Sequence, residues 1–241
     1  MYKYFDIIGA EAIIENNTLK FSSPDCFNDP FEFHDGLVKF DVDKNYIKGI
    51  VRKRTNDKKL IKKFLSDFES DKAGFIENLI NQFRRQKSET KICCFSETNL
   101  NILMWSHYSK NHTGACIQFD EAMLGKTFTG NSLISSVRYT QKLKALSFSK
   151  YRDKAVTNWV LTKSKDWEYE KEKRIVLGGN PDTIQRVSPQ AILKIIFGCK
   201  TIEKDLVRIS DLIEQKGFKW IRVSKMKIDC KEYRLIENYL K

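Results

Sequence analysis

The sequence predicts an α+β fold, a mixed or antiparallel sheet with flanking helices and an inserted helical hairpin. Three observations predict it. Short apolar segments bounded by turn residues indicate strands. Segments with apolar residues at helical spacing separate those strands. Between residues 45 and 90 the composition shifts towards charge, and a longer helical pattern interrupts the short periods. We expect one domain over 1–241, with 45–90 as a helical insertion.

The first segment predicts a strand, a helix and a second strand. "YKYF" (2–5) and "TLKFSS" (18–23) are typical of strands, and "IIGAEAIIENN" (7–17) has helical spacing. "PDCFNDPFE" (24–32) follows as a turn, because Asx side chains bond nearby backbone and proline fixes its own φ. Asn28 and Asp29 lie in this turn.

The insertion carries an amphipathic pattern that breaks near Gly74 and predicts two helices. Its basic residues either contact a polyanion or form a solvated helix face, and the sequence leaves both readings open. These residues are Arg52, Lys53, Arg54, Lys58, Lys59, Lys62 and Lys63.

From residue 91 onward the pattern predicts mostly strands. Helices are expected at 101–111, 155–163 and 202–217, the last of them closed by Gly217. The expected strands are 91–96, 115–119, 133–140, 167–177, 193–198, 219–224 and 225–229.

Composition narrows the class of protein. No apolar run approaches the roughly 20 residues of a membrane-spanning helix, and no leader pattern opens the chain, so we expect a cytoplasmic protein without a membrane partner. Six cysteines without C-x-x-C spacing indicate reduced thiols and no metal site. The net charge of +12 favours nucleic acid or acidic protein as a partner, although a Lys-rich proteome produces the same balance.

Several catalytic motifs are absent from the sequence. It contains no G-x-G-x-x-G dinucleotide loop, no G-x-x-x-x-G-K-[ST] phosphate loop, no H-E-x-x-H pair and no G-x-S-x-G elbow. A nucleotide ligand would therefore be held in some other way.

The segment "WEYEKEKRIV" (167–176) concentrates carboxylates. On a strand, Glu168, Glu170 and Glu172 share one face because side chains alternate. Such a row suits a site that stabilises a cation or holds a sugar hydroxyl. Arg174 follows on the same face and can neutralise one carboxylate, so an exposed edge strand with ion pairs is the alternative.

The segment "MWSHYSKNH" (104–112) combines aromatic residues with histidines. His107 and His112 are five residues apart, which does not suit paired metal ligands on one helix. Trp105 and Tyr108 have the spacing of one helix face, which indicates either core packing or a wall that stacks on a flat ring.

Three motifs together resemble a large, poorly characterised bacterial family with a domain of unknown function. They are "FNDPFE", "MWSHY" followed by H-x-G, and W-x-Y-E-x-E-x-R, and they cover residues 1 to about 198. More distantly, the order of elements resembles ADP-ribosyltransferases, which implies a split sheet. That resemblance implies that Glu172 is catalytic, that Glu170 orients the acceptor and that Ser96 supports Glu172. The opening strand offers Tyr2, Lys3 and Tyr4 where that family has His or Arg.

The resemblance implies NAD as a substrate and an oxocarbenium-like transition state. Breaking the bond between nicotinamide and ribose suits an adjacent carboxylate and an aromatic wall. A toxin or anti-phage defence effector that modifies nucleic acid or protein, with an antitoxin or regulatory partner, fits this activity. The residues expected around NAD are Tyr2, Tyr4, Asn28, Asp29, Trp105, His107, Tyr108, His112 and Arg174.

Two other classes stay open. A nuclease would use carboxylates and histidines against a phosphodiester, from the set Asp29, Glu32, His107, His112, Glu170 and Glu172. A non-catalytic component of a defence system would bind nucleic acid through the basic insertion, at Lys58, Lys59, Lys62 and Lys63.

Overall fold

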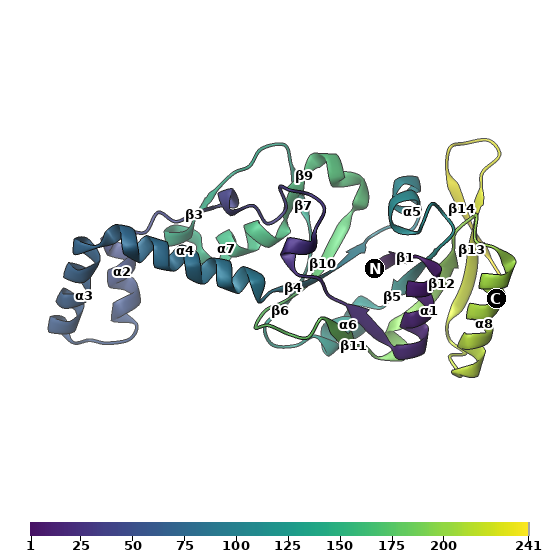
Figure 1. The fold of residues 1–241 in the computed structure, drawn as a ribbon, viewed down its shortest axis with the longest axis horizontal. Helices are drawn as coiled ribbons and strands as arrows, with labels where there is room; N and C mark the ends of the chain where they lie inside the picture. The colour runs from purple at the N-terminus through teal and green to yellow at the C-terminus, as the bar shows by residue number, and fades with distance from the viewer. Residues whose placement is uncertain (241) are drawn as a thin grey trace.

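The computed structural model describes residues 1–240, and for residues 152 and 153 it describes the backbone alone. Within these residues, eight strands form one mixed sheet (Figure 1). Neighbours are antiparallel except for the parallel pair β12 and β13. The α+β class, with a mixed sheet and flanking helices, is confirmed. In spatial order the strands are β14 (Leu235–Tyr239), β13 (Arg222–Ile228), β12 (Ile192–Phe197), β5 (Ala115–Phe119), β1 (Tyr2–Phe5), β4 (Lys91–Ser96), β10 (Glu172–Leu177) and β6 (Ser132–Ser136).

Shorter elements surround the sheet. Two-stranded ladders join β2 (Thr18–Lys20) to β11 (Ile184–Arg186), β3 (Val38–Lys39) to β8 (Leu146–Ser147), and β7 (Arg138–Thr140) to β9 (Thr162–Ser164). The α-helices are α1 (Ile7–Asn16), α2 (Lys44–Arg52), α3 (Lys58–Ser70), α4 (Lys72–Ser88), α5 (Ile102–Tyr108), α6 (Glu121–Thr127), α7 (Phe148–Leu161) and α8 (Glu203–Gln215). The 3₁₀ turns are η1 (Pro24–Cys26), η2 (Asp35–Leu37), η3 (Lys165–Glu170) and η4 (Pro189–Ala191).

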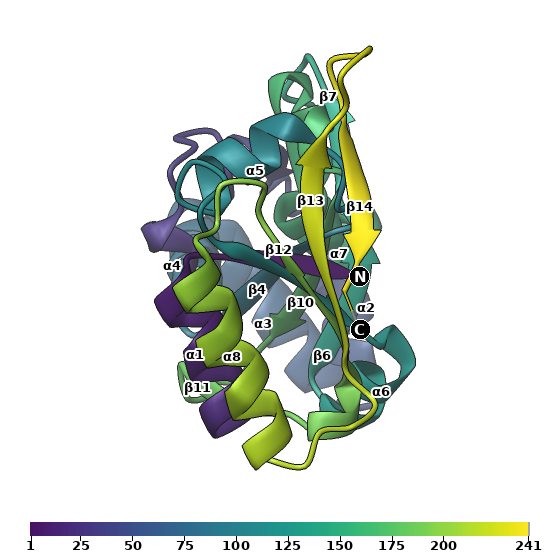
Figure 2. The same cartoon turned by 90° about the vertical axis from the view of Figure 1, so that its right-hand side faces the viewer.

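Alternating side chains on the central strands build a core on each face of the sheet. On one face α1 and α8 lie side by side (Figure 2), and their buried residues pack with Ile117 and Ile195. On the other face Trp105 of α5 packs with Cys116 and Ile196. Along β5 and β12, successive side chains therefore alternate between the two cores.

The sheet is weakly joined between β1 and β4. Strand β1 pairs with β5 along its whole length, and β4 pairs with β10 along its whole length. Between β1 and β4, the register records a single pair, Tyr2 with Ser96. The side chains beyond this pair are free to line a pocket between the two halves of the sheet.

Helices α2, α3 and α4 project from the sheet as a helical arm (Figure 1). A hairpin was expected here, and the structure has three helices. Asp57 accepts hydrogen bonds from the first turn of α3, and Asp71 accepts one from Gly74 of α4, so each aspartate starts a new helix. Val51 and Phe68 belong to a small apolar cluster inside the arm.

The H-x-G motif forms a tight turn after α5. Residues 110, 111 and 112 all have positive φ, which ends the helix earlier than the expected residue 111. A Cβ atom on Gly114 would lie 2.0 Å from the carbonyl oxygen of Phe5. Glycine is thus required for β5 to approach the end of β1 this closely.

Other boundaries also differ from the expectation. Helix α7 ends at Leu161, and the next three residues form β9 instead of continuing the helix to residue 163. Residues 222–228 form one strand where two were expected, and β14 pairs with it. None of the helices formed by residues 1–240 has the length and apolar character needed to cross a bilayer.

Candidate functional site

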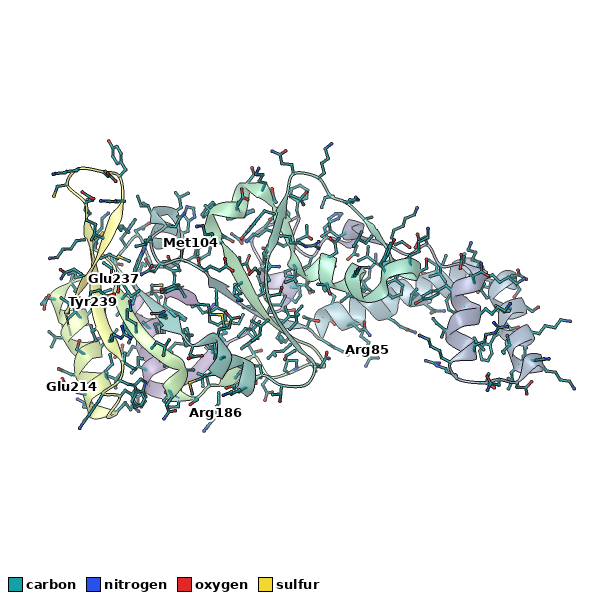
Figure 3. All side chains as sticks on the ribbon, turned by 180° about the vertical axis from the view of Figure 1, so that it is seen from behind. Arg85, Met104, Arg186, Glu214, Glu237 and Tyr239 are labelled. Atoms are coloured by element: carbon teal, nitrogen blue, oxygen red, sulfur yellow. The ribbon has the colours of Figure 1, made fainter. Side chains whose placement is uncertain are left out.

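A pocket of about 300 Å³ opens along the weak join of the sheet. Strand β1 contributes Tyr2 and Tyr4, β4 contributes Ser96, and the opposite wall contains Glu170 and Glu172. Its remaining lining includes Lys3, Lys20, Ser22, Cys26, Asn28, Met104, Tyr108 and Lys163. Met104 enters from α5 and is labelled in Figure 3. Concave sites with a few convergent polar groups are the usual form of ligand-binding sites.

Three of the expected site residues lie in one row across three neighbouring strands. Tyr2 of β1 is opposite Ser96 of β4, and Ser96 is opposite Glu172 of β10. The hydroxyl of Ser96 donates a 2.6 Å hydrogen bond to the main-chain carbonyl of Glu170. Ser96 therefore fixes the backbone that carries both glutamates.

Glu172 is held by Arg174, as strand alternation predicted. The Arg174 guanidinium donates to both carboxylate oxygens of Glu172, at 2.7 Å through Nε and 2.9 Å through Nη2. Burial opposes ionisation of Glu172, but the charge and hydrogen bonds of Arg174, aided by Lys163, outweigh it and lower the pKa of Glu172 to about 2. Glu172 is consequently a carboxylate at neutral pH, although only 4% of the residue is exposed to solvent.

Glu32 shares Arg174 with Glu172. Its Oε1 accepts from Nη2 of Arg174, while its Oε2 is buried without a hydrogen-bond donor among the described residues. Burial raises the pKa of Glu32, and the neighbouring cations only partly offset that effect. The "FNDPFE" motif thus reaches the same buried charge cluster as "WEYEKEKR".

Glu170 has a donor on each carboxylate oxygen. Tyr108 donates to Oε1 at 2.6 Å, and the Lys163 ammonium donates to Oε2 at 2.6 Å. Lys163 also lies 3.3 Å from Oε2 of Glu172. Although burial alone would lower the pKa of Lys163, the three surrounding carboxylates raise it above its usual range, so the ammonium stays charged.

The strand expected over 167–177 is only partly correct, because a turn precedes the strand and brings Glu170 next to Glu172. Residues 165–170 form η3, Lys171 adopts left-handed backbone angles, and the strand starts at Glu172. Glu168 is exposed and is not part of the row. The expected exposed edge strand is also wrong, because β10 lies between β4 and β6 and Arg174 is completely buried.

Trp105 does not form a wall of the pocket. Its side chain is fully buried, its Nε1 donates to the carbonyl of Asn99 at 2.6 Å, and Tyr4 packs against it edge to face. The alternative of core packing is the one realised. Tyr108 does line the pocket, through the hydroxyl that contacts Glu170.

The other expected residues divide between the pocket and its surroundings. Asn28 lines the pocket, whereas Asp29 is buried beside it in sequence and accepts from the Phe31 amide. His107 is exposed, with its Nδ1 3.2 Å from the Tyr169 hydroxyl. His112 lines a different cavity, of about 540 Å³, between the α5 turn and the β13–β14 hairpin.

The set of residues expected for a nuclease is therefore not assembled. Glu32, Glu170 and Glu172 converge, but Lys163 and Arg174 occupy the space between them and neither histidine joins them. Among the side chains that the structure describes, no cluster of three or more His, Cys, Asp or Glu is arranged to hold a metal ion.

Lys163 was missed by the sequence analysis. It lies at the end of an apolar helical pattern and seven residues before Glu170, where the E-x-E motif begins, so periodicity assigns it to a helix surface. The one available signal is its position between "AVTNWVL" and "WEYE", which does not specify a contact.

A model of the family described as "Protein of unknown function (DUF2971)" matches residues 104–175. The matched stretch contains "MWSHY", the H-x-G turn and the E-x-E-x-R segment, and thereby supports the resemblance to a family with a domain of unknown function. No curated protein and no solved structure matches the chain. Of the residues in and beside the pocket, the matched stretch contains Met104, Tyr108, Lys163, Glu170, Glu172 and Arg174.

Proposed function

We propose that the chain is an NAD-dependent ADP-ribosyltransferase-like enzyme whose reaction takes place in the pocket between β1 and β4. The observation that carries this proposal is the row of Tyr2, Ser96 and Glu172 across three adjacent strands. The resemblance called for three contributions: an opening strand that holds the cofactor ribose, a middle strand with a supporting hydroxyl and a late strand with a glutamate.

The chemical reason for a buried carboxylate is the transition state. When the bond between nicotinamide and ribose C1′ breaks, its electron pair goes to the nicotinamide nitrogen, and C1′ becomes oxocarbenium-like. Glu172 is ionised and shielded from water, so its field acts on that developing charge in a medium of low dielectric constant. An acceptor then bonds to C1′ and gives up its proton, and we assign the receipt of that proton to Glu170, which lines the pocket.

The pocket suits one end of NAD. Its volume lies at the lower end of the range of ligand pockets, so it fits the nicotinamide and its ribose while the rest of the dinucleotide extends across the mouth. Tyr2 supplies aromatic and hydroxyl contacts, Tyr108 supplies an aromatic contact, and the exposed Lys20 supplies positive charge for the pyrophosphate.

The test uses liquid chromatography to measure the free nicotinamide that the protein releases from NAD when water is the acceptor. Wild-type protein is expected to release nicotinamide, and Glu172→Gln is expected to lose at least about 100-fold in kcat. Lys173→Met is the matched control, because Lys173 lies next to Glu172 on β10 but pairs with Glu121 near the surface. Equal rates of nicotinamide release for wild type and Glu172→Gln would show that Glu172 takes no part in the reaction.

A second candidate function, binding of single-stranded nucleic acid, is favoured by one surface of the helical arm. Lys58, Lys59, Lys62 and Lys63 are exposed along α3, and so are Leu60 and, directly after Lys63, Phe64. Lysines that contact phosphates, interleaved with an aromatic ring that stacks on bases, are the elements of such a surface.

Charge reversal at these four lysines tests the arm. The variant is expected to bind a single-stranded oligonucleotide more weakly and with a smaller dependence on salt, measured by fluorescence anisotropy at several salt concentrations. Reversal of Lys204, Lys216, Lys219 and Lys227, outside the arm, is the control. An unchanged salt dependence in the α3 variant would exclude this surface.

A further inference from the structure

Lys163 occupies an unusual position for a lysine. Its ammonium lies 2.6 Å from Glu170, 3.3 Å from Glu172 and 3.6 Å from Glu32, and the side chains of all four residues are at most 4% exposed. The ring of Trp167 covers it, with a distance of 4.7 Å from Nζ to the ring centroid. Because moving an ammonium out of water is unfavourable, this arrangement needs compensation from its partners.

The need to neutralise Glu172 does not explain why Lys163 is buried here. Arg174 already donates to both oxygens of Glu172 and, through Nη2, to Glu32. No hydrogen bond or ion pair links Arg174 to Glu170 within the described part of the chain. Lys163 is the cation there that contacts both pocket carboxylates.

The second oxygen of Glu170 is held by Tyr108. The phenol donates at 2.6 Å to Oε1, while Lys163 donates to Oε2. Two carboxylates that share one ammonium would repel each other without it, and Glu170 would turn away from Glu172. The titratable groups around Lys163 include Glu32, Tyr139, Tyr169, Glu170 and Glu172, and Tyr108 and Arg174 lie on the far sides of the carboxylates.

We infer that Lys163 and Tyr108 are positioning residues that hold the Glu170 carboxylate beside Glu172, facing the pocket. This inference rests on the proposed function, because it makes the acceptor step depend on the geometry of Glu170. The buried Lys163 holds one oxygen of the Glu170 carboxylate, and the partly exposed Tyr108 holds the other. Neither residue needs to contact the bond that breaks.

The first test uses Lys163→Met, with Lys173→Met as the matched control. Loss of positioning is expected to lower kcat for nicotinamide release about 100-fold, because small displacements of a reacting group have effects of this size. The KM for NAD is expected to stay within about threefold, since methionine keeps most of the length of the lysine side chain and the other lining residues are unchanged. The control is expected to keep both constants. A folded Lys163→Met protein with wild-type kcat would overturn the inference.

Tyr108→Phe keeps the inference testable if Lys163→Met does not fold. Tyr108 is partly exposed, and the substitution removes one hydroxyl, so the fold is expected to persist. The expected result is a fall in kcat of roughly 10-fold with an unchanged KM. Tyr169→Phe, which removes the neighbouring hydroxyl that contacts His107, is the control. A wild-type kcat in Tyr108→Phe would show that Glu170 does not need its second donor.

A measurement without NAD separates this inference from the proposed function. Thermal unfolding midpoints are compared for Lys163→Met, Glu170→Gln and the double variant. If the two groups hold each other, the shifts do not add, and the double variant unfolds at or above the midpoint of Lys163→Met. Additive shifts would overturn the positioning role whatever the activity shows. Non-additive shifts in a protein that never cleaves NAD would retain the positioning and reject the proposed function.

Discussion

The helical arm and the pocket use charge in opposite ways. On the arm, most lysines and arginines are exposed, and in the ion pair of Lys44 with Glu69 both side chains are more than half exposed. In and beside the pocket, Lys163, Glu172 and Arg174 are almost completely buried. Exposed pairs contribute about 0 to 1 kcal/mol, whereas buried charges cost several kcal/mol unless they are paired. The net charge of +12 therefore does not single out one region of the chain, whereas buried charge singles out the pocket as the candidate site.

The comparison predicts its largest effect at Arg174. Arg174→Leu would leave Glu172 and Glu32 buried without their main partner, so the free energy of unfolding is expected to fall by about 3–5 kcal/mol. Urea denaturation measures this change. The control is Arg208→Leu, which removes an exposed ion pair with Glu11 and is expected to cost less than about 1 kcal/mol. Similar losses in the two variants would contradict the distinction between the two kinds of charge.

A smaller effect is expected from pH. The pKa of Glu172 is about 2 in the folded protein against 4.5 as the reference, so its ionisation stabilises the fold above about pH 4.5. That contribution, on the order of 3 kcal/mol, is lost as the pH falls from 4.5 towards 2. The stability difference between wild type and Glu172→Gln is therefore expected to shrink over this range. Glu121→Gln, at the surface, serves as the control; a constant difference for Glu172→Gln would show that Glu172 is not ionised as described.

The smallest effect is expected on the arm. Reversing the charge of Lys58, Lys59, Lys62 and Lys63 together is expected to change the free energy of unfolding by less than about 1 kcal/mol, because these side chains are solvated. Nicotinamide release is expected to be unchanged. Calorimetric unfolding and the release assay measure the two quantities, and a large loss in either would mean that the arm and the pocket are coupled.

Local pattern predicted part of the site. Alternation along one strand placed Arg174 beside Glu172, because residues two apart share a face. The strands that carry Tyr2 and Ser96 were also expected at residues 2–5 and 91–96, as found. These features depend on short-range periodicity, which a sequence displays directly.

The rest depends on contacts between distant segments. Lys163 meets its partners because a helix ends at Leu161 and η3 turns back, and neither event follows from hydrophobic spacing. The alternation of "WEYEKEKR" indicated a strand throughout, yet the left-handed Lys171 separates the turn from the strand. Trp105 and Tyr108 have the spacing of one helix face, which allowed a pocket wall, but Trp105 packs in the core against the sheet. Tertiary packing decides such cases.

The most direct measurement uses a cysteine that already lines the pocket. Cys26 is exposed in the same pocket as Glu170 and Glu172, and Cys230 is exposed in the cavity that contains His112. Alkylation of each thiol by iodoacetamide is followed by mass spectrometry with and without millimolar NAD. If NAD occupies the pocket, alkylation of Cys26 slows several-fold while Cys230 reacts at its former rate. Unchanged alkylation of Cys26 would contradict the proposal that this pocket binds NAD.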